Sequence, residues 1–168
     1  MTESLVDSVR IFVTVGAQMP FDRLVGSVDA WAADRQGCEL FAQVGPGGAT
    51  PANFPASEFL EPSAFRAKIE WCDVMVAHAG MGSILTALQY GKRILVLPRR
   101  GDLRETRNDH QVASARRFGE LESIDVALTT DELPARLEAL GVMPDQTKIQ
   151  DHASSRLLNA ISAIIANA

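Results

Sequence analysis

The chain has 168 residues, of which 46% are hydrophobic and 22% charged, with a formal net charge of −5 and a mean hydropathy close to zero. This length and composition are typical of a soluble globular protein, so we predict one domain over residues 1–168 with a complete core. The acidic residues near the start and the shortness of every apolar run argue against a secretory signal and a membrane-spanning helix, and predict a cytoplasmic protein.

The first half of the chain alternates between strand and helix patterns. A β-branched run ends at Gly16, which is typical of a strand, and the segment after it has apolar residues at helical spacing. A second β-rich run opens at Glu39, and Pro62 suits the first turn of a helix. We therefore predict strands at 11–15, 39–44 and 58–60, and helices at 21–34 and 62–71.

The second half repeats this alternation. Ser83 is expected to cap a helix that Gly91 ends, and Thr130 is expected to cap a later helix. The elements predicted here are strands at 74–77, 93–97 and 124–128, and helices at 83–90, 109–118, 131–140 and 153–166.

Strands that alternate with helices predict an α/β fold, with a Rossmann-like parallel sheet covered by helices on both faces. In such sheets, ligands bind beyond the carboxyl ends of the strands. Gly16, His78 and Pro98 all fall at such ends. We therefore expect a ligand site where these residues meet.

The most informative motif is the segment His78-Ala-Gly-Met-Gly-Ser83. Its glycines allow a tight turn, and the helix that follows directs free N–H groups and the positive end of its dipole at one spot. Such turns bind phosphates. The candidate ligand-binding residues are His78, Gly80, Met81, Gly82 and Ser83. The alternative is a plain tight turn beside a buried histidine, with Ser83 acting only as a helix cap.

Residues 92–117 contain eight Lys and Arg against three Asp and Glu, a net charge of +5, whereas the whole chain carries −5. A basic segment on an acidic protein concentrates small anions, which favours a phosphorylated ligand over nucleic acid. Arg99 and Arg100 follow a strand at its carboxyl end, where their guanidinium groups could bind a diphosphate in bidentate fashion. A solvated or partner-facing loop is the alternative.

The two cysteines, Cys38 and Cys72, have neither metal-ligand spacing nor a CxxC pair, so we expect buried free thiols. The sequence also lacks an Asp-x-Asp cluster that could hold a metal ion. No metal and no other cofactor is therefore expected.

Four motifs occur in order along the chain: Gly16-Ala-Gln18, His78-Ala-Gly-Met-Gly-Ser83, Gly91-Lys-Arg-Ile-Leu-Val-Leu-Pro98 and Arg107-Asn-Asp-His-Gln111. With them the chain, from about residue 11 to 118, resembles the C-terminal domain of family 28 glycosyltransferases. It is most similar to the one-domain members. These are the small subunit of the two-chain N-acetylglucosaminyltransferase of dolichol-linked glycan synthesis, and its bacterial exopolysaccharide counterparts.

The resemblance implies the UDP-sugar-binding C-terminal half of a GT-B enzyme, a hexosyltransferase that is active only with a separate membrane-anchored subunit. That partner would bind a lipid-linked acceptor, supply the catalytic base and hold this chain at the inner membrane face, in exopolysaccharide biosynthesis. In the family, the two glycine turns approach the diphosphate and the Asp-His-Gln segment reaches the donor sugar. The donor-binding residues implied here are Gly16, Ala17 and Gln18, Gly80 to Ser83, and Asn108, His110 and Gln111.

One position departs from the family pattern. Many relatives have a glutamate where this chain has Thr86, and that carboxylate accepts hydrogen bonds from both ribose hydroxyls. A threonine offers one neutral oxygen, so a contribution of about 1.5 to 3 kcal/mol per bond becomes about 1. This keeps open a second hypothesis, a non-catalytic nucleotide-binding or regulatory module of the same fold. A dinucleotide-dependent oxidoreductase is disfavoured, because the first turn, Gly16-Ala-Gln-Met-Pro20, is not GxGxxG.

Overall fold

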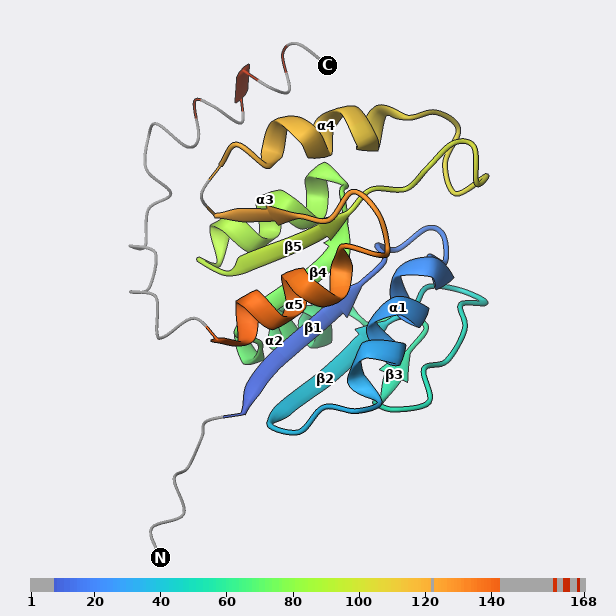
Figure 1. The fold of residues 1–168 in the computed structure, drawn as a ribbon, viewed down its shortest axis with the longest axis vertical. Coiled ribbons are helices and arrows are strands. Elements are labelled where there is room, and N and C mark those ends of the chain that lie inside the picture. The colour runs from blue at the N-terminus through green and yellow to red at the C-terminus, as the bar shows by residue number, and fades with distance from the viewer. Residues whose placement is uncertain (1–7, 122, 143–158, 160–161, 164–165, 167–168) are drawn as a thin grey trace, which may run out of the picture.

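A computed structural model describes residues 8–121, 123–142, 159, 162–163 and 166 (Figure 1). The strands and helices alternate along the chain. The elements are β1 (Val9–Thr14), α1 (Asp22–Ala32), β2 (Cys38–Gln43), β3 (Ala56–Ser57), α2 (Pro62–Trp71), β4 (Val74–His78), α3 (Met81–Gln89), β5 (Arg93–Leu97), α4 (His110–Phe118), β6 (Ile124–Val126) and α5 (Leu133–Val142). The helix expected over 153–166 lies largely outside the described residues.

The strands form one sheet in the order β3-β2-β1-β4-β5-β6, and every neighbouring pair is parallel. The chain builds outward from β1 on one side and from β4 on the other, so the strand order reverses between β1 and β4. Such a reversal opens a crevice at the carboxyl ends of the two strands. The predicted α/β, Rossmann-like fold is confirmed.

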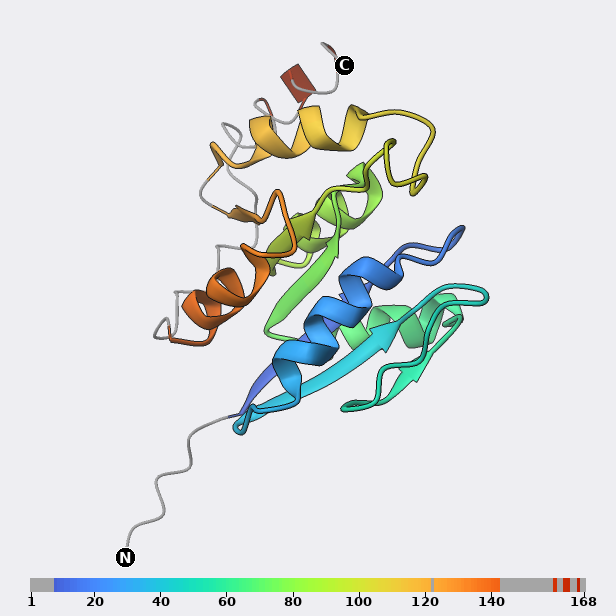
Figure 2. The same cartoon turned by 45° about the vertical axis from the view of Figure 1, so that its right-hand side comes forward.

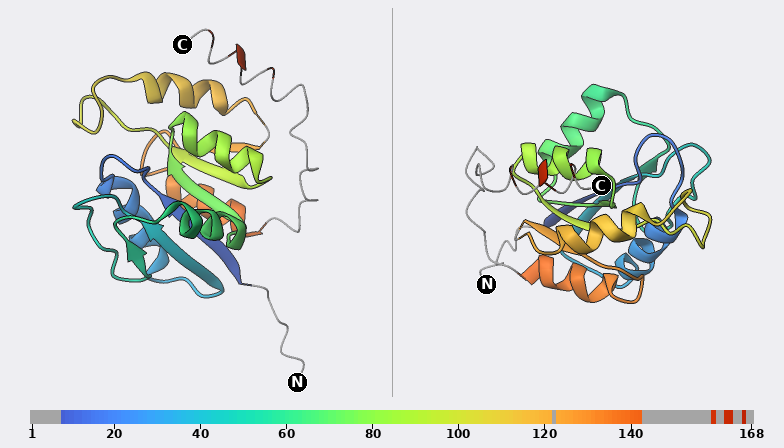
Figure 3. Two further views of the ribbon diagram at one scale, coloured as in Figure 1. Left: turned by 180° about the vertical axis from the view of Figure 1, so that it is seen from behind. Right: turned by 90° about the horizontal axis from the view of Figure 1, so that it is seen from above.

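Helices cover both faces of the sheet. Figure 1 shows α1 and α5 in front of it, Figure 2 shows α1 lying along β1 and β2, and the view from behind in Figure 3 shows α2 and α3. Buried residues of α1 and α5 share one core cluster, and those of α2, α3 and α4 share the other. Side chains along each central strand point alternately to the two faces of the sheet, so each strand contributes to both core clusters. In β1, for example, Val13 packs into the first cluster and Phe12 into the second.

Several element bounds differ from the predicted ones for local reasons. The strand β3 lies at Ala56–Ser57 and not at 58–60, because only these two residues pair with β2. Directly after them, the Ser57 hydroxyl donates to the Phe59 carbonyl. Helix α5 begins at Leu133, two residues later than expected, so Thr130 is not its cap residue. Among the described residues, no helix is long and apolar enough to cross a membrane.

Candidate functional site

The candidate residues gather at the carboxyl ends of the central strands. Gly16 follows β1, His78 ends β4, and Arg99 follows β5 after one proline. The amino-terminal ends of α3 and α4 face the same rim, because each helix begins in the loop that leaves one of these strands. This rim contains the crevice between β1 and β4, and it is the place at the strand ends where we expect the ligand site.

The imidazole ring of His78 is enclosed by two glycines. A Cβ atom at Gly16 would lie 3.0 Å from Nε2 of His78, and one at Gly80 would lie 2.1 Å from Cε1. Gly16 also has a φ of +83°, which favours glycine on backbone grounds. A side chain at residue 80 would overlap this ring, and one at residue 16 would be both tight against it and strained in its backbone.

Two side chains approach the nitrogens of the same ring. The Gln111 amide nitrogen lies 3.4 Å from Nδ1, and the Ser83 hydroxyl lies 3.3 Å from Nε2. Burial, together with the smaller effect of the positive charge of Arg99, lowers the pKa of His78 to about 4. His78 is therefore neutral at physiological pH and can donate one hydrogen bond and accept another.

Arg99 is 5% exposed, and its guanidinium group points into the protein. It donates to the backbone carbonyl oxygens of Val15, Met19 and Pro20 at 2.8, 2.9 and 2.8 Å. The group also lies 4.6 Å from the ring centroid of Phe21. The expected bidentate contact with a diphosphate does not fit this orientation. Arg99 instead fixes the loop between β1 and α1.

The loop that follows β5 is held by an ion pair that sequence reasoning missed. Arg23 of α1 donates to both carboxylate oxygens of Glu105, at 2.5 and 2.9 Å, and to the Pro98 carbonyl at 2.9 Å. Glu105 in turn accepts the Arg100 N–H at 3.1 Å. The Arg100 side chain pairs with Asp102 on the surface. No spacing signal links Arg23 to a residue 82 positions later.

Helix α3 begins at Met81, with Gly80 as its N-cap residue, and no side chain caps it. The prediction that Ser83 caps this helix is therefore wrong, because Ser83 is its third residue and faces His78 instead. The first intrahelical bond runs from the Ile84 N–H to the Gly80 carbonyl. The preceding amides, those of Met81, Gly82 and Ser83, have no intrahelical acceptor and are available to an anion.

The space beside these amides is open. Gly82 is exposed, and a Cβ atom there would meet nothing within 4 Å. One turn further, the Thr86 hydroxyl donates to the Gly82 carbonyl at 2.7 Å, which leaves only its oxygen lone pairs for a ligand. The amino-terminal end of α3 is therefore accessible to a ligand without rearrangement.

The remaining predicted residues line the edge of the rim. Ala17 and Gln18 are exposed in the loop after β1. His110 is exposed at the first position of α4. Its backbone N–H donates to the side-chain oxygen Oδ1 of Asn108 at 3.1 Å. Their contact with a ligand stays a prediction.

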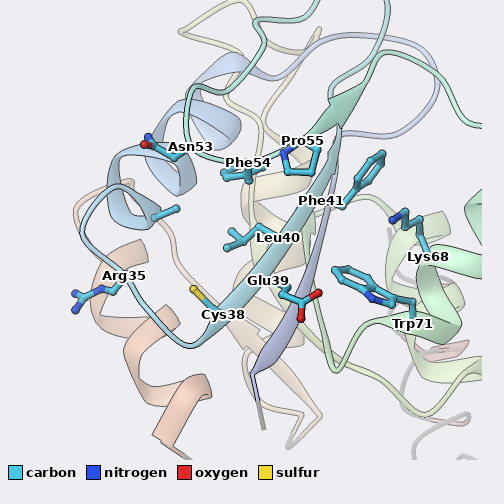
Figure 4. A pocket seen from close by; sticks show the side chains of 11 residues that line it. Arg35, Cys38, Glu39, Leu40, Phe41, Asn53, Phe54, Pro55, Lys68 and Trp71 are labelled. Carbon is cyan, nitrogen blue, oxygen red and sulfur yellow. The ribbon is translucent and has the colours of Figure 1, made fainter. Parts of the chain in front are cut away.

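The described cavities lie elsewhere. One, of about 420 Å³, follows the outer edge of β2 between α2 and the loop that ends at Pro55 (Figure 4). Another, of about 430 Å³, lies at the amino-terminal ends of β1, β2 and β4. Neither contains a candidate site residue. At the rim itself, Ala17, Gln18, Gly82 and His110 are exposed.

The cysteines match the expectation only in part. Cys72 is fully buried and its pKa is raised to about 11 by burial, whereas Cys38 is half-buried and lines both cavities. Within the described part of the chain, no cluster of three or more His, Cys, Asp or Glu side chains could hold a metal ion.

Solved structures share this fold at low sequence identity. The solution structure of ALG13 is 21% identical, with a TM-score of 0.64 over 96% of this chain and 100% of its own. The glycotransferase of kitacinnamycin is 20% identical (TM-score 0.62), and glycosyltransferase VinC in complex with DTDP is 21% identical (TM-score 0.50). The last two alignments cover 98% and 93% of this chain but only 40% and 36% of those longer chains.

No curated protein matches the chain in sequence. A family model does, over residues 10–165, which spans the sheet and the whole rim described above. Together with the shared fold, this match assigns the chain to the family that its motifs indicated. The chain belongs to the glycosyltransferase family 28 C-terminal domain family.

Proposed function

We propose that this chain binds the UDP-sugar donor of a glycosyltransferase whose acceptor-binding half is a separate, membrane-anchored subunit. The complex would transfer a sugar to a lipid-linked acceptor in exopolysaccharide biosynthesis, with this chain at the cytoplasmic face of the membrane through its partner. The observation that carries the proposal is the open amino-terminal end of α3 beside Gly16 and neutral His78, at the reversal point between β1 and β4.

The geometry suits a leaving nucleoside diphosphate. As the bond between sugar and phosphate breaks, negative charge builds on the diphosphate, and donors aimed at it stabilise that state more than the bound substrate. The amides of Met81 to Ser83, the positive end of the α3 dipole and the Ser83 hydroxyl are such donors. Among the described residues of the rim, no carboxylate is fully buried, and the partly buried Glu105 is paired with Arg23, so the base belongs to the partner in this proposal.

The open rim also supports a divided enzyme. A ligand cleft normally encloses most of its ligand, whereas Ala17, Gln18, Gly82 and His110 on this rim are all exposed. In the longer relatives, this domain is about two fifths of the chain. A second subunit would close the cleft over the donor from above the rim.

The test is isothermal titration calorimetry of UDP binding to the wild-type chain and to the Gly82→Asp variant. Residue 82 has room for a side chain, so the variant should fold normally while its carboxylate repels the diphosphate from the α3 amides. One unfavourable charge pair at about 4 Å costs about 1 to 4 kcal/mol, which predicts at least a fivefold loss of affinity. The matched control is Gly26→Asp on the exposed face of α1, where a side chain also meets nothing within 4 Å. Equal UDP affinities for all three proteins would refute the site.

The second candidate is a non-catalytic nucleotide-binding module. It is favoured by Thr86, whose hydroxyl already donates within α3, where a ribose-binding carboxylate is expected in an active relative. Coexpression with a candidate membrane subunit, followed by an assay of sugar incorporation into lipid, separates the two hypotheses. The transferase proposal expects incorporation only when both chains are present, whereas the module hypothesis expects UDP binding without any transfer.

A further inference from the structure

The Gln111 side chain lies between two groups of the protein. Its Oε1 accepts the Arg99 backbone N–H at 3.0 Å, and its Nε2 lies 3.4 Å from Nδ1 of His78. A backbone N–H can only donate, so the oxygen of the amide must face Arg99 and the NH₂ group must face the imidazole. The orientation of the Gln111 amide is therefore fixed by the main chain after β5.

This orientation decides which ring nitrogen of His78 carries the proton. The Gln111 NH₂ group can only donate, so Nδ1 must be the acceptor, and the single proton of the neutral ring must sit on Nε2. The Nε2–H then donates to the Ser83 oxygen, 3.3 Å away. The depressed pKa of His78 agrees with a neutral ring in this position.

This chain of hydrogen bonds, which runs from Arg99 through Gln111 and His78, ends at the hydroxyl hydrogen of Ser83. Because the Ser83 oxygen accepts from His78, its own hydrogen must point elsewhere, and no other described residue accepts it. Ser83 is the third residue of α3, beside the amides that lack intrahelical acceptors. A phosphate oxygen at this end of the helix would take both the amide hydrogens and the hydroxyl hydrogen.

We infer that Gln111 is a positioning residue that sets the Nε2–H tautomer of His78 and thereby frees the Ser83 hydroxyl to donate to a phosphate oxygen of the donor. This inference rests on the proposed function and assigns Gln111 a different role from the contact with the donor sugar that the family resemblance implies. Its amide is already engaged on both sides within the protein. Gln111 acts on the ligand only through His78 and Ser83.

UDP, which lacks the sugar that a UDP-sugar donor transfers, separates the two roles. Replacement of Gln111→Met keeps the length of the side chain and removes both hydrogen bonds. A positioning role predicts that the affinity for UDP itself falls by about tenfold, the typical weight of one hydrogen bond to a charged group. A sugar-contact role predicts an unchanged affinity for UDP and a loss only for a UDP-sugar such as UDP-N-acetylglucosamine, and that result would overturn the inference. Gln89→Met, on the exposed end of α3, is the matched control.

The tautomer itself can be observed without any ligand. In long-range ¹H–¹⁵N spectra of the wild type, the His78 ring should show Nε2 protonated and Nδ1 as the acceptor. The Gln111→Glu variant still accepts from Arg99 but presents a carboxylate oxygen to Nδ1, so Nδ1 should become protonated. A wild-type spectrum with the proton on Nδ1 overturns the inference and leaves the proposed function standing, whereas a wild type that binds no UDP overturns the proposed function.

Discussion

Replacement of Arg99→Met tests whether this buried guanidinium group organises the loop between β1 and α1. The substitution removes hydrogen bonds to three carbonyl oxygens, those of Val15, Met19 and Pro20, and a cation–π contact with Phe21. Methionine fills most of the same volume without a charge. The loss therefore reports on the hydrogen bonds and the ring contact more than on a cavity.

The expected loss in the free energy of unfolding depends on which of the three carbonyl oxygens water can reach in the variant. Val15 is 1% exposed, so its carbonyl oxygen loses a donor that water cannot easily replace, at about 1 to 3 kcal/mol. Met19 and Pro20 are exposed, and water can take over their carbonyls at little cost. The cation–π contact adds about 1 to 2 kcal/mol, and relief of the buried charge offsets part of the total. We expect a net loss of about 2 to 3 kcal/mol in the free energy of unfolding.

Urea denaturation followed by circular dichroism measures this change. With an m-value of about 2 kcal/mol per M, the midpoint should fall by about 1 to 1.5 M at an unchanged m-value. The matched control is Arg100→Met, which removes a neighbouring guanidinium whose partner, Asp102, lies on the surface. The midpoint of that variant should stay close to the wild-type value. If both variants unfolded at the wild-type midpoint, the structural role of Arg99 would be refuted.

Further predictions concern the glycines, the histidine and the thiols. Gly80→Ala should lower the free energy of unfolding by about 1 to 3 kcal/mol in thermal melts, because its Cβ would overlap the His78 ring, whereas Gly82→Ala should leave it nearly unchanged. The pKa of His78 is depressed from 6.5 to about 4, so the unfolded chain binds this proton first as the pH falls. The resulting loss of stability begins near pH 6.5 and reaches roughly 3 kcal/mol near pH 4, and urea titrations of His78→Gln should lack it. Cys72, buried with a pKa of about 11, should react with a thiol reagent at pH 8 only after unfolding, unlike half-buried Cys38.

The sequence pattern sufficed for the sheet because each central strand is buried on both faces. In β5, for example, residues 94–97 are continuously apolar and lie between Gly91 and Pro98, which leaves little choice of element. The predicted bounds of helices and strands were wrong where tertiary contacts determine them. The strand β3 lies at Ala56–Ser57 because these residues pair with β2, and α3 begins directly after Gly80, which lies against the His78 ring. Neither contact leaves a trace in local periodicity.

The candidate site was predictable in its location but not in its internal roles. Glycine turns and strand ends indicated the rim where Gly16 and His78 meet. The direction of a side chain did not follow from such patterns. Arg99 and Arg100 are neighbours of identical chemistry, yet one guanidinium turns inward to three carbonyls and the other outward to Asp102. Only the loop after β1, brought alongside by the sheet order, distinguishes them.

The same contacts that hold the rim together also determine how the isolated chain should behave. The loop after β1 is fixed by Arg99, the loop after β5 by Arg23 and Glu105, and the start of α3 by the fit between Gly80 and His78. Groups that are already ordered lose little conformational entropy when a ligand arrives. The proposed donor-binding surface is therefore preorganised without a second subunit. If the enzyme is divided as proposed, the partner contributes acceptor binding and closure of the cleft, so the isolated chain should bind UDP while lacking transfer activity.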